Sequence, residues 1–167
     1  MVDLEVLRKL ILDGHIAGAA IDVFPVEPEK NGDRFRTPLQ DCPNVLLTPH
    51  IGGSTEEAQQ NIGEDVSLKL FNYLEKGITF GSQSIPALAL PPKEGSHRIL
   101  HIHNNVPGVL SDINTQLSKN KINILGQYLK TNEEIGYVVL DVDKQLSSRA
   151  LQLLKEVKET IKVRMLY

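Results

Sequence analysis

The sequence contains a single cysteine, Cys42, among 167 residues. One thiol excludes an intrachain disulfide and any metal site built from several cysteines. An excess of positive charge is also missing, because 18 Lys and Arg residues stand against 21 Asp and Glu residues and the formal net charge is −3. This balance gives no electrostatic reason to expect nucleic acid or an anionic membrane as a partner.

Long apolar runs are absent as well. No stretch approaches the roughly 18 apolar residues of a membrane span, and the first residues lack the basic and apolar regions of a signal peptide. Hydrophobic residues nevertheless make up 41% of the chain and charged residues 23%. These proportions are typical of a folded protein. We therefore expect a cytoplasmic protein.

The first third of the chain predicts helices and strands of α/β type. Leucine and isoleucine recur at helical spacing after Asp3, which is placed to cap that helix. Apolar runs follow at residues 17–24 and 45–47, with a Pro-, Glu- and Gly-rich loop at 25–43 between them. The first run is typical of a parallel strand covered on both faces.

A long helix is predicted next. Ser54 and Glu57 fit a capping box, and apolar residues then recur every four positions from Ala58 to Leu74. Such a narrow apolar stripe predicts that the helix packs across another body. Prolines and glycines make residues 78–96 a connector.

The last part of the chain follows a different order of elements. Strands are predicted at residues 98–104, 122–130, 135–142 and 161–167, and helices at 107–119 and 147–157. The order βαββαβ is the ferredoxin-like unit. A unit of roughly 70 residues is small, so pairing of a sheet edge with a second copy would stabilise it.

The predicted fold class is therefore α/β with three parts. Residues 1–53 are expected to be the C-terminal remnant of a doubly wound, Rossmann-like nucleotide-binding domain, because two strands do not make a self-sufficient parallel sheet. Residues 54–94 are expected to hold a crossover helix, a substrate-domain segment and a linker. Residues 95–167 are expected to form the complete βαββαβ domain.

Polar residues follow both apolar runs of the first part. Ligands of open α/β sheets bind beyond the carboxyl ends of the strands, where Asp22, Glu27 and His50 are expected. A histidine exchanges a proton near neutral pH, and a carboxylate on its other nitrogen fixes the tautomer. Oxidation of an alcohol needs such a base, while a nicotinamide accepts the hydride.

Each of these residues also has a simpler explanation. A histidine after a proline is usually a loop residue, and Glu27 before a proline is more often a solvated carboxylate. The Gly52–Gly53 pair fits a tight turn, and Asp22 fits a turn at a strand end. The combination of these residues favours the catalytic interpretation.

Two segments resemble a known family. Residues 19–28 (AAIDVFPVEP) and 44–55 (NVLLTPHIGGST) resemble the C-terminal signature of NAD-dependent D-2-hydroxyacid dehydrogenases, and residues 101–110 (HIHNNVPGVL) resemble an ACT domain. The pairing resembles family members that oxidise 3-phospho-D-glycerate to 3-phosphohydroxypyruvate with NAD during L-serine biosynthesis. The resemblance covers essentially the whole chain.

The resemblance implies roles for individual residues. His50 corresponds to the catalytic acid/base and Glu27 to its paired carboxylate. Asp22 corresponds to the residue near the nicotinamide carboxamide, and the segment His50, Ile51, Gly52 and Gly53 to the lining of the nicotinamide site.

Other parts of the family pattern have no counterpart in this sequence. These are the glycine-rich turn for the pyrophosphate, the acidic residue for the ribose and the arginine that binds the substrate carboxylate, which falls just before Met1. Arg8 is no substitute, since it lies within the first predicted helix. We expect that the 167 residues alone have no dehydrogenase activity.

The ACT resemblance implies an effector site for L-serine where two such domains pair their sheet edges, as part of a homo-oligomer. His103 and Asn105 correspond to effector contacts, and Asn123 to a third. An asparagine offers both a donor and an acceptor to a zwitterion. Asn123 fits a strand-end residue equally well. The alternative function is a stand-alone serine-binding, dimer-forming regulatory module.

Overall fold

The computed structural model describes residues 2–30 and 32–167. The chain divides into two compact units, residues 1–62 and 63–167, and each is described by itself. Helix α2 (Glu56–Lys76) runs through the division. Within the described residues, no helix combines the length and the apolar character needed to cross a membrane.

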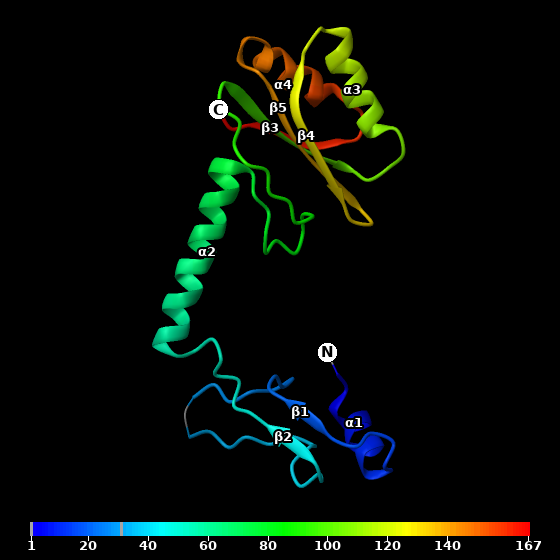
Figure 1. Cartoon of the computed structure of the whole chain (residues 1–167). Helices are drawn as coiled ribbons and strands as arrows, with labels where there is room; N and C mark the ends of the chain where they lie inside the picture. The colour runs from blue at the N-terminus through cyan, green and yellow to red at the C-terminus, as the bar shows by residue number, and fades with distance from the viewer. Residues whose placement is uncertain (1, 31) are drawn as a thin grey trace. The chain divides into compact units, whose positions relative to one another are not determined.

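In the first unit a short helix packs against two parallel strands (Figure 1). Helix α1 (Leu4–Leu12) begins after Asp3, whose carboxylate accepts hydrogen bonds from the backbone N–H groups of Glu5 and Val6. This N-cap confirms the predicted helix start. Buried residues of α1 pack with Phe24 and Leu39 to form the core of the unit.

The two strands are β1 (Ala19–Ile21) and β2 (Val45–Leu47), paired in parallel with Ala19 opposite Val45. The β2 prediction is confirmed, whereas β1 is shorter than the apolar run that predicted it. The prediction that β1 is covered on both faces is wrong for this unit. The middle residue of each strand is exposed, and Leu46 retains 62% of its accessible surface, because α1 covers only one face of the pair.

The predicted cap of α2 lies one residue later than expected. The hydroxyl of Thr55, not that of Ser54, accepts a hydrogen bond from the Ala58 N–H at 3.1 Å. Both residues can cap a helix, and the tight turn closed by the Ser54 N–H on the Ile51 carbonyl makes Thr55 the last residue before the helix. None of the α2 residues is buried, so the predicted packing partner of its apolar stripe is not found among the described residues.

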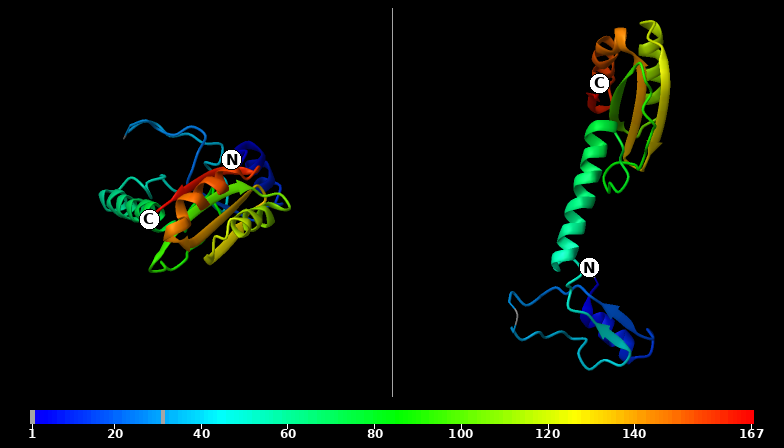
Figure 2. Two further views of the ribbon diagram at one scale, coloured as in Figure 1. Left: turned by 90° about the horizontal axis from the view of Figure 1, so that it is seen from above. Right: turned by 60° about the vertical axis from the view of Figure 1, so that its left-hand side comes forward.

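The second unit contains a four-stranded antiparallel sheet in the order β4-β5-β3-β6. Helices α3 and α4 lie on one face of this sheet (Figures 1 and 2). The elements are β3 (Ser96–Asn104), α3 (Val109–Lys119), β4 (Ile124–Thr131), β5 (Ile135–Asp143), α4 (Ser147–Glu156) and β6 (Thr160–Met165). The predicted βαββαβ order is confirmed, with boundaries shifted by a few residues.

Successive side chains of β3 point to opposite faces of the sheet and pack into two different hydrophobic cores. Ile99 faces the two helices with Val138 and Leu140, whereas Leu100 faces the connector with Tyr137. Leucines of the connector, Leu88 and Leu90, cover this second face. Both faces of the central strands are therefore buried, unlike the strands of the first unit.

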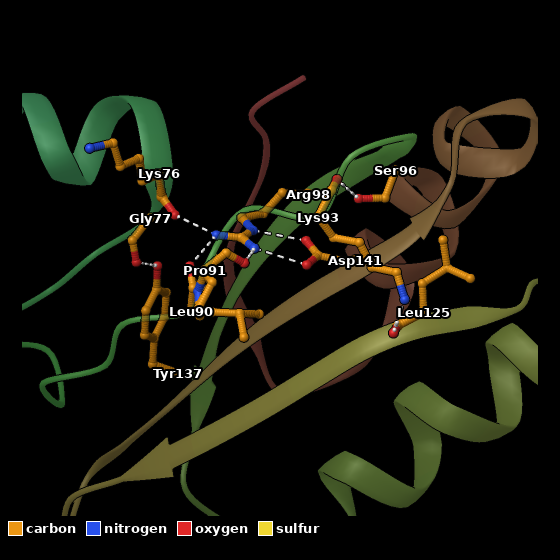
Figure 3. A network of polar contacts seen from close by, with 10 residues as sticks. All are labelled: Lys76, Gly77, Leu90, Pro91, Lys93, Ser96, Arg98, Leu125, Tyr137 and Asp141. Carbon is orange, nitrogen blue, oxygen red and sulfur yellow. Dashed lines mark hydrogen bonds and ion pairs between the residues drawn. The ribbon is translucent and has the colours of Figure 1, made fainter.

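A buried guanidinium joins the connector to the sheet (Figure 3). Arg98 on β3 is fully buried and donates two hydrogen bonds of 2.8 Å to the Asp141 carboxylate on β5. Its remaining donors reach the backbone carbonyls of Lys76, Leu90 and Pro91. The buried guanidinium therefore has both an ion-pair partner and hydrogen bonds from all of its nitrogens, as a buried charge requires.

Candidate active site and effector site

The carboxyl ends of β1 and β2 are tied together by Asp22. Its Oδ1 atom accepts hydrogen bonds from the Thr48 hydroxyl at 2.5 Å and from the His50 backbone N–H at 3.1 Å. His50 has φ of +51°, which is uncommon for a residue other than glycine, and the bond to Asp22 holds the backbone in this conformation. Asp22 therefore fixes the loop that carries His50.

His50 and Glu27 form a pair. The His50 Nδ1 atom lies 2.9 Å from both carboxylate oxygens of Glu27. Glu27 is itself positioned by the Phe24 N–H, which donates to Oε1 at 2.9 Å. The Nε2 atom of His50 has no hydrogen-bond partner among the described residues. The ring is thus held from one side and open on the other.

The charges at this site support one another. The hydrogen bond and the negative charge of Glu27 raise the pKa of His50 above its ordinary value. The Phe24 N–H and then the His50 side chain lower the pKa of Glu27, and the Thr48 hydroxyl lowers the pKa of Asp22. The arrangement favours a carboxylate–imidazolium pair, which suits a group that receives a proton and returns it.

A hollow of about 640 Å³ lies in front of this pair. Its wall includes His50 and Glu27 and, on the apolar side, Leu47 and Phe35. Phe35 belongs to the long loop and contacts Phe24 edge-to-face with a centroid distance of 4.7 Å. This contact brings the loop back over the ends of the strands.

The glycines after His50 leave open space. A Cβ atom added at Gly52 would meet nothing within 4 Å, and one at Gly53 would meet only the Ile62 side chain at 3.8 Å. Packing among the described residues therefore does not require glycine here. The loop surface at Gly52 and Gly53 therefore has room for a further group.

Arg8 lies apart from this site, as its place in the first helix predicted. Its Nη1 atom donates to the Pro38 carbonyl at 3.0 Å and contacts the Cys42 sulfur at 3.2 Å. The guanidinium therefore ties α1 to the long loop.

Two predicted effector residues lie together at the end of β3. His103 is 3% exposed, and Asn105 follows it in the loop before α3. The Asn105 side chain donates to the Asn132 carbonyl at 2.7 Å, and its backbone N–H donates to the Glu134 carbonyl. Asn105 thereby joins the end of β3 to the β4–β5 turn.

The third predicted effector residue, Asn123, lies at the other end of the sheet. It precedes Ile124, which pairs with Val142, and Val142 pairs in turn with His97 at the start of β3. His103 pairs with Gly136 at the opposite end. A single copy therefore does not bring Asn123 to His103 and Asn105.

The sequence did not predict the groups that position the side chains of the two candidate sites. Thr48 positions Asp22, and the Phe24 N–H positions Glu27. The Thr160 hydroxyl contacts His101 on β3. The spacing of three residues from Phe24 to Glu27 is a turn signal that points to the backbone contact. No local signal relates Thr160 to β3, because the two are joined only by strand pairing.

Family comparisons agree with both halves of the fold. Residues 1–52 match the D-isomer specific 2-hydroxyacid dehydrogenase, NAD binding domain, and residues 99–164 match the AHAS small subunit-like ACT domain. Over 167 residues the chain is 48% identical to D-3-phosphoglycerate dehydrogenase of Haemophilus influenzae. The chain matches the C-terminal portion of D-3-phosphoglycerate dehydrogenase. The predicted resemblance and fold class are confirmed.

The match covers all of this chain but only part of each relative. D-3-phosphoglycerate dehydrogenase of Escherichia coli K12 is 47% identical over 169 residues. The chain spans 41% of the length of both relatives. Among solved structures, the ACT domain of GTP pyrophosphokinase from Chlorobium tepidum aligns with 42% of this chain and 95% of its own, at 18% identity and a TM-score of 0.38.

Proposed function

We propose that this chain serves as the acid/base and effector portion of a D-3-phosphoglycerate dehydrogenase. The reaction is the NAD-dependent oxidation of 3-phospho-D-glycerate to 3-phosphohydroxypyruvate, which leads to L-serine. The observation that carries the proposal is the His50–Glu27 pair, held at 2.9 Å beside an open hollow in a segment that matches an NAD-binding domain.

His50 and Glu27 have different roles in the proton transfer. The open Nε2 atom of His50 takes the hydroxyl proton of the substrate, and Glu27 stabilises the imidazolium that results. NAD, when bound, accepts the hydride from the carbinol carbon. In the reverse direction His50 returns the proton to the carbonyl oxygen.

In this proposal the loop from His50 to Gly53, with Ile51 between, would line the nicotinamide, and Asp22 would lie beside its carboxamide. The open space at Gly52 supports a flat group against this backbone. The pyrophosphate turn and the arginine for the substrate carboxylate come from the rest of such an enzyme. The 167 residues alone are then inactive, because the base has no means of positioning the reactants.

A chimera tests this function. The N-terminal part of the Escherichia coli relative, up to the start of the aligned region, is joined to this chain, and NADH formation from 3-phosphoglycerate is measured. We expect activity in the chimera, a loss of about 10²–10⁴-fold in kcat for His50→Gln, and no activity in the chain alone above its His50→Ala control. A folded His50→Gln chimera with full activity contradicts the role of His50.

L-serine is the proposed effector, bound where two copies pair along β4. Strand β4 is an edge strand, and its exposed Tyr128 and Leu129 offer apolar surface to a second copy. Antiparallel pairing of two β4 strands would bring Asn123 of one copy beside the Asn105 region of the other. The opposite positions of these residues in one chain support a site shared by two copies.

A calorimetric titration with L-serine tests the effector site. We expect binding heat in the wild type and its loss in Asn105→Ala and in Asn123→Ala. Sedimentation of the same samples reports whether the chain is dimeric. Serine binding by a dimer together with an inactive chimera would favour the alternative function, a stand-alone regulatory module.

A further inference from the structure

Two histidines of β3 are buried side by side on the helix-facing side of the sheet. His101 is fully buried and His103 is 3% exposed. Their Nδ1 atoms lie 3.3 Å apart, and the His101 Nε2 atom lies 2.9 Å from the Thr160 hydroxyl on β6. These contacts form a continuous chain from Thr160 to His103.

The proton positions in this chain follow from a backbone carbonyl. The Thr160 hydroxyl lies 2.9 Å from the carbonyl oxygen of Leu154 on α4. A carbonyl only accepts, so the single hydroxyl proton of Thr160 is directed to it. The Thr160 oxygen can then only accept from His101, and the Nε2 atom of His101 must carry a hydrogen.

The tautomer of His103 is set in turn. A neutral His101 with its hydrogen on Nε2 has a bare Nδ1 atom. The 3.3 Å contact between the two Nδ1 atoms is then a hydrogen bond only if His103 donates from Nδ1. The Nε2 atom of His103 is consequently bare and accepts hydrogen bonds.

Burial keeps both rings neutral. Desolvation, followed by the positive charge of a protonated His103, lowers the pKa of His101 to about 4. Desolvation also lowers the pKa of His103. The tautomer argument therefore holds at neutral pH, where neither ring carries a second hydrogen.

The His103 ring also has a fixed place. Gly136 lies opposite His103 on β5, and a Cβ atom added there would lie 2.1 Å from the His103 Nε2 atom. The ring thus occupies the space that a side chain at position 136 would take. Its Nε2 atom has no hydrogen-bond partner among the described residues.

We propose that Thr160 and His101 are positioning residues that hold His103 in the tautomer with a bare Nε2 atom, so that the effector site accepts a hydrogen bond from its ligand. The ligand group is then a donor, either the ammonium or the hydroxyl group of an amino acid such as L-serine. This inference rests on the proposed effector function for the identity of the ligand. The tautomers themselves do not depend on it.

Long-range ¹H–¹⁵N NMR of the full chain tests the tautomers directly, because bare and protonated ring nitrogens have widely separated ¹⁵N shifts. Spectra of His101→Gln and His103→Gln assign the two rings. We expect His101 with a bare Nδ1 and His103 with a bare Nε2. A wild-type spectrum with the hydrogen of His103 on Nε2 overturns the proposal, whether or not serine binds.

The Thr160 contact is tested with two matched variants. Thr160→Val removes the hydroxyl at constant shape and should leave His103 as a mixture of tautomers, whereas Thr160→Ser should keep the wild-type pattern. Unchanged tautomers in a folded Thr160→Val protein overturn the role of Thr160. If Thr160→Val does not fold, the wild-type spectrum and Thr160→Ser still decide the question.

Ligand titrations separate this inference from the proposed function. On addition of L-serine, the ¹⁵N shift of the His103 Nε2 atom should move as it accepts a hydrogen bond, and affinity should fall about tenfold in Thr160→Val. L-alanine lacks the hydroxyl and 3-hydroxypropionate lacks the ammonium, so the analogue that leaves this shift unmoved identifies the missing donor. If serine binds without moving this shift, the ligand contact is wrong. If serine does not bind, the effector function fails while the tautomer result stands.

Discussion

The two units of this chain place their charged groups differently. In residues 63–167, the Arg98 guanidinium is buried, and each of its three nitrogens donates a hydrogen bond to a nearby oxygen. In residues 1–62, His50 and Glu27 are exposed at strand ends, and one ring nitrogen has no partner among the described residues. A charge enclosed by its partners is costly to unpair, whereas a charge held from one side remains able to react.

Removing the buried charge should have the largest effect. Arg98→Met leaves the Asp141 carboxylate buried without its partner, and we expect a loss of about 3–5 kcal/mol in the free energy of unfolding. Urea unfolding, followed through the amide signals of the four-stranded sheet, measures it. The double variant Arg98→Met/Asp141→Leu should recover much of the loss. A single variant as stable as wild type would show that leaving the Asp141 carboxylate without Arg98 carries no such cost.

Substitution of one leucine in each unit compares how strongly burial stabilises the two units. Leu154 on α4 is fully buried, whereas Leu46 in the middle of β2 is 62% exposed. Leu154→Ala should cost about 2–5 kcal/mol, because it leaves a cavity in a closed core. Leu46→Ala should change the free energy of unfolding by less than about 0.5 kcal/mol. Equal costs in the two units, measured by hydrogen exchange, would contradict the difference in burial.

Substitution of one glycine near each candidate site compares how closely the two sites are packed. Gly136→Ala forces the His103 ring to move and should destabilise the second unit by about 1–3 kcal/mol. Gly52→Ala meets open space and should leave stability nearly unchanged. In the chimera described above, Gly52→Ala should instead raise the KM for NAD. Thermal unfolding and steady-state kinetics separate the two outcomes.

The smallest expected effect is a shift in titration. Glu27→Gln removes the charge that raises the pKa of His50, so this pKa should fall toward its ordinary value near 6.5 in an NMR titration. A raised pKa in the folded state stabilises it below the unfolded pKa, and this stabilisation is lost as pH rises through the folded pKa. The stabilisation that the raised His50 pKa contributes, and that Glu27→Gln removes, should therefore be seen at acidic pH. An unchanged pKa would show that Glu27 does not interact with the ring in solution.

The second unit could be predicted almost completely because its strands and helices form a core with their own neighbours. The alternation at Ile161 and Val163 was enough to predict β6, since the sheet that it joins lies within the same chain. The apolar run at 17–24 was less informative. Its composition does not show how many residues pair, and the partner strand allows only Ala19–Ile21.

The candidate site could be predicted in composition but not in detail. The sequence pattern placed Glu27 and His50 beyond the strand ends, and the family resemblance implied that they pair. The structure brings the two side chains together. The position of Asn123 relative to His103 could not be inferred. Its place just before β4 in the sequence does not show at which end of the sheet β4 begins. Likewise, Thr160 and His101 are 59 residues apart and meet only through the pairing of β3 with β6.

The acceptors of Arg98 affect how the protein can be dissected. Three of them are carbonyls that precede the sheet, at Lys76, Leu90 and Pro91, and the Tyr137 hydroxyl adds a bond of 2.7 Å to the Gly77 carbonyl (Figure 3). A truncation that starts at Gly95, where the sequence pattern changes, would remove all four carbonyls and keep both side chains. An excised C-terminal domain should therefore include the last turn of α2.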